Sequence, residues 1–159
     1  MDLIFGLPVH PLVVHAAVVF IPLAAIGALI VLFTEKARKK FIPVVTAAVV
    51  IASVSAFVAS ESGEALAKRV GLPQEHAIQG ERLWKIVFLF TLLFFIWAYY
   101  SRKRRKQSKF SKIIKLTLRL AVTVTALASI ALTFVVGHSG ADATWKYRVQ
   151  ISQPSAENE

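Results

Sequence analysis

Long apolar runs are the feature that most restricts how this chain can fold. Residues 11–33 contain no acidic or basic side chain apart from His15, and residues 41–60 contain none. Two further runs, 83–100 and 116–136, each carry a single cation near the start. About 20 apolar residues are enough for a helix to cross the hydrocarbon core of a bilayer. The sequence therefore predicts four transmembrane helices, at about 11–33, 41–60, 83–100 and 116–136.

The composition agrees with this interpretation and narrows the chemistry. Hydrophobic residues make up 56% of the 159-residue chain, more than a water-soluble domain of this size can bury. We predict an all-α integral membrane four-helix bundle, with one domain over residues 1–149 and a polar tail over 150–159. The chain has no cysteine, which excludes disulfides, thiolate metal ligands and Cys-ligated iron–sulfur clusters. A metal would have to be held by His, carboxylate, Met or backbone oxygen.

The basic residues indicate an orientation. They gather in the first and third connections, at 36–40 and 102–119, so that one side of the membrane holds 13 Lys plus Arg and one acid. The other side holds six basic residues and eight acids. Because cytoplasmic loops carry the excess of Lys and Arg, we predict that both termini are extracytoplasmic. The expected location is the bacterial inner membrane, as a multi-pass protein with anionic lipids at its cytoplasmic loops.

The basic run at 102–106 could also indicate nucleic-acid binding, because clustered cations neutralise phosphates. It follows a predicted span directly and lacks interleaved aromatic residues, so the topology explains it and we expect no nucleic-acid partner. Four aromatic residues near the ends of the third span fit interfacial anchors, whose amphipathic rings favour headgroup depth. They are Trp84, Trp97, Tyr99 and Tyr100.

The four histidines all fall on the predicted extracytoplasmic side, and acids accompany them. Neighbouring helices of a bundle with short connections are antiparallel, so the outer ends of all four helices meet at one mouth. Ionisable residues at such positions are functional-site candidates by default. The candidate ligands are His10, His15, His76 and His138, with Glu64 and Glu81, and the supporting carboxylates are Glu61 and Asp142.

Depth in the membrane ranks His15 first among these ligands. It lies inside the first span, about 7 Å deep at 1.5 Å per residue, where an unpaired imidazole is costly. Its expected partners are His138 and His76, with Glu64, Glu81 and Asp142 fixing the imidazole tautomers. His10 precedes Pro11 and could serve only to start a helix. We therefore expect His15→Ala to abolish ligand binding more completely than His10→Ala.

Four motifs occur in a fixed order: GLPVHPLVVHAAVVFIPLAAIGAL, then SGEAL, then EHAIQGE, then GHSGADATW. With them, the chain resembles a bacterial integral membrane family catalogued as domain of unknown function 2231, in particular its actinobacterial branch. The resemblance covers residues 6–149. Its fold is similar to that of small membrane cytochromes, in which paired histidines on facing helices hold b-type haem. The resemblance therefore implies haem b at His10, His15, His76 and His138, and electron transfer to a redox partner.

Two other classes of function stay open. The same histidines with Glu64 and Glu81 could bind a non-haem Zn, Cu or Fe ion, since imidazole and carboxylate suit these metals. Alternatively, the polar cluster could link helix ends in a structural or assembly subunit of a membrane complex, or in a homo-oligomer. A hydrolase is disfavoured, because neither SGE nor HSG matches a nucleophile elbow. Whether the chain is an enzyme is therefore left open, with a cytochrome-like redox role as the candidate.

Overall fold

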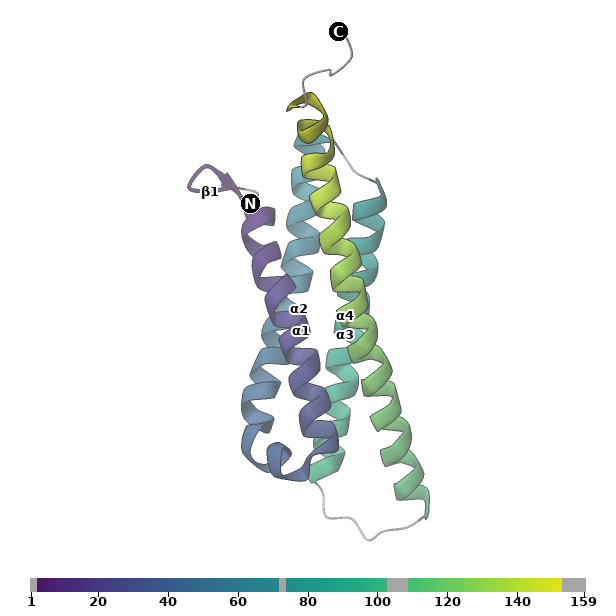
Figure 1. Ribbon diagram of the computed structural model, residues 1–159. Helices are drawn as coiled ribbons and strands as arrows, with labels where there is room; N and C mark the ends of the chain where they lie inside the picture. Colours follow the sequence, from purple (N-terminus) through teal and green to yellow (C-terminus); the bar gives the residue numbers. More distant parts are fainter. Residues whose placement is uncertain (1–2, 72–73, 103–108, 153–159) are drawn as a thin grey trace.

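Four long antiparallel helices dominate the computed structural model, which describes residues 3–71, 74–102 and 109–152 (Figure 1). All four helices are long and apolar enough to cross a membrane. The prediction of an all-helical, four-span bundle is confirmed. The helices are α1 (Val9–Phe33), α2 (Glu35–Val70), α3 (Gln74–Arg102) and α4 (Lys109–Ser152).

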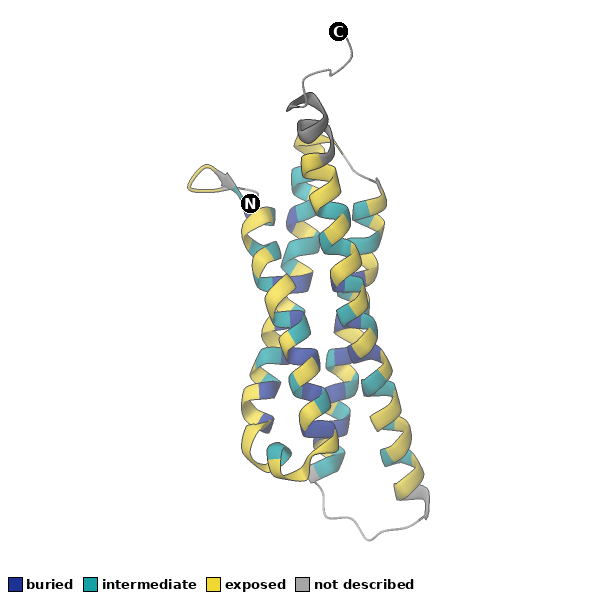
Figure 2. Ribbon diagram, in the orientation of Figure 1, coloured by how far each residue is buried: buried dark blue, intermediate teal, exposed yellow. Residues whose placement is uncertain are grey.

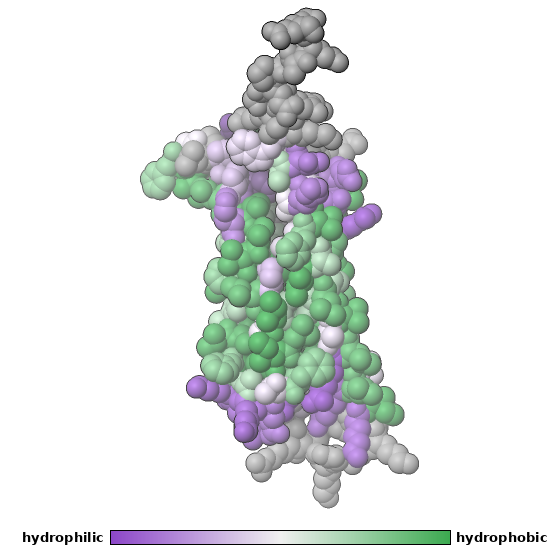
Figure 3. All heavy atoms as spheres, viewed as in Figure 1, coloured by the Kyte–Doolittle hydropathy of each residue, from purple (hydrophilic) through white to green (hydrophobic). Residues whose placement is uncertain are grey.

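An apolar belt crosses the middle of the bundle on the face seen in Figure 3, with hydrophilic surface above and below it. Large side chains in this belt are exposed, including Phe88, Val124 and Phe134. Outward-facing apolar residues of this size require a lipid environment, so the protein is a multi-pass membrane protein. We call the end that carries Arg38, Lys115 and Arg119 the basic end. The opposite end, which carries His10 and His76, is the histidine end.

Each helix packs against two neighbours, most extensively α1 on α2 and α3 on α4. Helices α1 and α3 therefore lie diagonally across the bundle, as do α2 and α4. Small residues allow close approach between α1 and α2: a Cβ added to Gly27 would lie 3.2 Å from Cγ2 of Val45. Such small-residue contacts are typical of membrane helices, which gain little from apolar burial alone.

The buried residues form one stripe along each helix (Figure 2). Their spacing alternates between three and four residues, which is the repeat of coiled-coil-like bundle packing. On α1 the stripe includes Ala17, Ile21, Ala24 and Ala28, and on α3 it includes Leu83, Val87, Phe90, Phe94 and Trp97. On α2 it includes Val49, Ala52 and Ala56, and on α4 it includes Val122, Ala126, Ser129 and Thr133.

The helices are longer than the apolar runs predict, chiefly at the histidine end. Helix α2 continues to Val70, α3 begins at Gln74 and α4 continues to Ser152. The polar motifs SGE, HAIQGE and GHSGAD are thus helical, and Gly137 lies inside α4. Of the predicted polar tail, residues 150–152 belong to α4, and residues 153–159 lie outside the described part of the chain.

A short hairpin, which the sequence analysis did not anticipate, precedes α1. Strands β1 (Leu3–Ile4) and β2 (Leu7–Pro8) pair antiparallel through a two-residue turn. Both turn residues have positive φ, 50° at Phe5 and 79° at Gly6. Tight hairpins favour this backbone, although it is strained for a residue with a side chain. The hairpin projects to the side of the bundle at the histidine end (Figure 1).

Candidate functional site

The outermost layer of the bundle core consists of two histidines and two glycines. His10 on α1 and His76 on α3 meet across the diagonal, with ring centroids 6.1 Å apart and ring planes at 79°. The other diagonal supplies Gly63 on α2 and Gly140 on α4. Each of these four residues lies seven positions from a buried stripe residue of its own helix, Ala17, Ala56, Leu83 and Thr133 respectively for α1 to α4. The histidine pair is therefore a continuation of the core, not a surface cluster.

The His10 ring is held against α2. Its Nδ1 lies 2.8 Å from the carbonyl oxygen of Ala59, and a Cβ added to Gly63 would lie 3.0 Å from its Cε1. A carbonyl can only accept a hydrogen bond, so Nδ1 of His10 donates. The same carbonyl accepts the hydroxyl of Ser62 at 3.2 Å. The hydrogen bond and the missing side chain at Gly63 together fix the ring position.

The His76 ring is held against α4 in the same way. Its Nδ1 lies 3.0 Å from Oγ of Ser139, and a Cβ added to Gly140 would lie 3.0 Å from its Cε1. The Ser139 hydroxyl donates to the carbonyl of Val136 at 3.1 Å, so its oxygen is left to accept from Nδ1 of His76. Both imidazoles are thus anchored through Nδ1.

An imidazole that donates through Nδ1 keeps its lone pair on Nε2, which is the form that ligates a metal. The pair therefore presents two potential ligand nitrogens, the Nε2 atoms, from diagonal helices. The orientation of each ring is fixed by the hydrogen bond of its Nδ1 atom. Carbonyl and hydroxyl acceptors behind a ligating histidine are the usual means of fixing its tautomer and ring orientation. This arrangement can bind an ion or cofactor that takes two imidazole ligands.

Three residues close in sequence to the pair or its glycines have open space or an unsatisfied polar atom. Gly80 follows His76 by one turn of α3, and a Cβ added there would meet no atom within 4 Å. The same is true of Gly137 on α4. The side-chain oxygen of Gln79 is buried and bonds to no described residue. A buried polar atom without a partner calls for an additional group, such as water or a ligand.

The structure separates the other two histidines from the pair. His15 is exposed, and its Nδ1 lies 2.5 Å from the carbonyl oxygen of Pro11 on its own helix. His138 is also exposed. The expected partnership of His15 with His76 and His138 is not seen, because five residues of α-helix turn His15 to the side opposite His10. The ranking of His15 above His10 for ligand binding stays a prediction, and in the structure the His10 ring is the one that meets His76.

The carboxylates predicted to support the site are exposed. Glu81 pairs with Lys85 at 2.5 Å on the surface of α3. Glu61 and Glu64 line a groove of about 370 Å³ beside Val9, which Lys68 also lines. Asp142 lies on the outward-projecting part of α4. Among the described residues, no group of three or more His, Asp or Glu side chains is placed to hold a metal ion.

Sequence reasoning missed the residues that orient the pair: Ala59, Gly63, Ser139 and Gly140. The signal available for them is the seven-residue spacing, which places both glycines on the buried stripes of their helices. A glycine at a core position leaves room for a large side chain from a facing helix. The acceptor roles of Ala59 and Ser139 depend on helix pairing, which spacing alone does not reveal.

Comparison with known proteins places this geometry in a family. A family model described as "Predicted membrane protein (DUF2231)" matches residues 6–153. The match includes all four motifs and the four residues of the outermost layer, His10, Gly63, His76 and Gly140. No curated protein and no solved structure matches the chain.

Proposed function

Because this chain belongs to the DUF2231 family of predicted membrane proteins, whose description names no reaction, we propose its function from the site: His10 and His76 hold a b-type haem for electron transfer. The observation that carries the proposal is the diagonal pair itself, with ring centroids 6.1 Å apart. Two imidazoles on facing helices could together hold the iron of a b-type haem. When bound, haem would supply one-electron redox chemistry.

Two details of the pair support a ligand role over simple packing. Both rings already donate through Nδ1, to the Ala59 carbonyl and to Ser139, which leaves both Nε2 atoms available. The ring centroids lie 6.1 Å apart on opposite helices, so both imidazoles would be within reach of one ligand placed between them. The protein's contribution would be to orient both nitrogens before the ligand arrives.

The surroundings support a ligand larger than a single ion. A Cβ added to Gly80, one turn of α3 after His76, or to Gly137, one turn of α4 before Gly140, would meet no atom within 4 Å. The buried, unpaired oxygen of Gln79 belongs to an amide that can both donate and accept hydrogen bonds. By contrast, a Zn or Cu centre needs three or four converging side chains, and the described residues bring no such group together. A two-imidazole centre therefore ranks above a non-haem metal site.

The test is an absorption spectrum of the full chain, purified in detergent from cells supplied with haem precursors. We expect a Soret band and one haem per chain, lost on His10→Ala and on His76→Ala. The matched controls are His15→Ala and His138→Ala, each of which removes an exposed imidazole. His15 lies on α1 with His10, and His138 lies on α4, the helix against which His76 packs. Circular dichroism establishes that each variant keeps its helices.

The outcomes separate the three classes of function. Loss of haem in the two control variants, with retention in His10→Ala, would contradict the proposed ligands. A colourless wild-type protein with one metal ion per chain would indicate the non-haem centre instead. A colourless, metal-free protein would indicate a structural subunit, in which the pair only links α1 and α3.

A further inference from the structure

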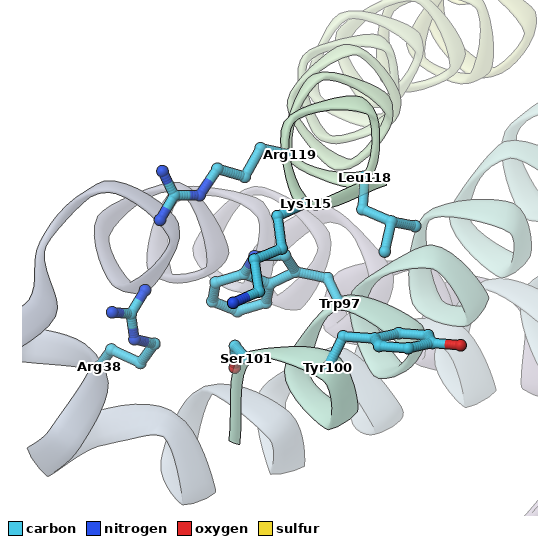
Figure 4. A pocket seen from close by; sticks show the side chains of 7 residues that line it. All are labelled: Arg38, Trp97, Tyr100, Ser101, Lys115, Leu118 and Arg119. Carbon is cyan, nitrogen blue, oxygen red and sulfur yellow. The ribbon is translucent and has the colours of Figure 1, made fainter. Parts of the chain in front are cut away.

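The basic end contains a second site, separate from the histidine pair. Seven residues from α2, α3 and α4 line a cavity of about 100 Å³ (Figure 4). Three of them are cations from two different helices, and the remainder are aromatic, aliphatic or hydroxyl side chains. The lining residues are Arg38, Trp97, Tyr100, Ser101, Lys115, Leu118 and Arg119.

Trp97 forms the floor of this cavity and fixes one of its cations. The indole is 3% exposed, so it is a core side chain and not the lipid-facing anchor that its position in the sequence predicts. The guanidinium carbon of Arg38 lies 5.9 Å from the centre of the Trp97 ring system. A cation–π contact of this kind holds the guanidinium in place while its N–H groups stay available for an anion.

The three cations lack an acidic partner in the described part of the chain. No carboxylate lines the cavity, and neither Arg38, Lys115 nor Arg119 forms an ion pair with a described carboxylate. Glu35, the acid closest in sequence to Arg38, is paired with Lys39 at 2.9 Å. Like charges that share a cavity repel one another, so an anion bound among them would stabilise this arrangement.

The location and the mixed lining indicate which anion fits. The cavity lies where the apolar segments of α3 and α4 meet the basic end, and Leu118 and Trp97 line it beside the cations. Basic pockets between membrane helices bind lipid phosphate groups, and a guanidinium matches a phosphate with two parallel hydrogen bonds. Diffuse electrostatic attraction between basic loops and anionic lipids would need no such pocket.

We propose that Arg38, Lys115 and Arg119 form a specific site for a phosphate group, with Trp97 as its floor. The phosphate can be presented by an anionic phospholipid headgroup or by a soluble phosphate compound. This site is independent of the proposed haem site, because it lies at the other end of the bundle and shares no residue with it.

The test is native mass spectrometry of the full chain in a neutral detergent, titrated with phosphatidylglycerol or phosphatidylcholine. We expect one phosphatidylglycerol to bind per chain, about tenfold more tightly than to Arg38→Gln/Arg119→Gln. The matched control is Lys36→Gln/Lys112→Gln, which removes two exposed positive charges from the same end without touching the cavity or the Lys39–Glu35 ion pair. This control should bind as the wild type does.

Inorganic phosphate distinguishes the two sources of the anion. If it competes with phosphatidylglycerol and raises the melting temperature of the wild type but not of Arg38→Gln/Arg119→Gln, the site takes soluble phosphate. If it has no effect while phosphatidylglycerol binds, the site takes a lipid headgroup. Equal binding of both lipids, or equal loss in both double variants, would overturn the proposal. Arg119→Gln alone, at an exposed position, serves if the double variant does not fold.

Discussion

At the histidine end, the half-buried His10 and His76 are hydrogen-bonded to the protein itself, whereas at the basic end Arg38 and Lys115 are half-buried cations without a described carboxylate partner. His10 and His76 each have an acceptor for Nδ1 on a neighbouring helix. Arg38 has an aromatic ring beneath it instead. The difference teaches that polar groups near the core can be stabilised in two ways: both imidazoles bond to neighbouring helices, whereas the Arg38 guanidinium packs on an aromatic ring and keeps its charge unpaired among the described carboxylates.

The largest expected effect is the difference in stability loss between Trp→Ala substitutions at the two ends. Trp97 is buried at the basic end, so Trp97→Ala should lower the free energy of unfolding by about 3–5 kcal/mol. Trp84 lies towards the histidine end, is half-buried and contacts Phe57 at 5.8 Å, so Trp84→Ala should cost clearly less. Denaturation in detergent, followed by circular dichroism, measures both. Equal costs would contradict the assignment of Trp97 to the core.

A smaller effect, with opposite signs, is expected for two glycines of α4. Gly140→Ala places a Cβ 3.0 Å from the His76 ring and should cost about 1–3 kcal/mol by displacing it. Gly137→Ala meets no atom within 4 Å and should stabilise the helix by about 0.5–1 kcal/mol. Thermal unfolding of the two variants is the measurement. If both variants gained stability, Gly140 would not be a packing partner of His76.

The smallest effect concerns the hydroxyl that orients His76. Ser139→Ala removes the acceptor of Nδ1 and should lower the free energy of unfolding by about 1 kcal/mol. The control is Thr46→Val, which removes a hydroxyl that donates to the Ile42 carbonyl of its own helix. In the haem-loaded protein, Ser139→Ala should also shift the reduction potential, and Thr46→Val should not. A shift of equal size in both would argue against Ser139 as the orienting group.

The four spans could be predicted from the sequence because apolar runs of this length have few alternative structures. The ends of the helices could not, because residues 61–70 and 137–152 are polar and contain glycine, which commonly terminates helices. They are helical here, and the extra turns carry the layer formed by Gly63 and Gly140. Hydropathy marks where a helix leaves the hydrocarbon, not where its backbone hydrogen bonds end.

The sequence predicts a site at the histidine end, and depth in the membrane ranks His15 above His10 there. That depth does not reveal which side of the helix faces the core: His10 lies seven residues from buried Ala17, and His76 lies seven from buried Leu83. This spacing is visible in the sequence. The contacts of His10 with α2, and of His76 with α4, required knowledge of which helices are neighbours.

The connection between α1 and α2 consists of Thr34 alone, and its brevity has a consequence for how the chain tolerates changes in length. A residue inserted between His10 and Thr34 would shift the imidazole by about 1.5 Å along α1 and rotate it by about 100°. No slack in the connection could restore its alignment with Gly63. Insertions and deletions within α1 should therefore be rejected.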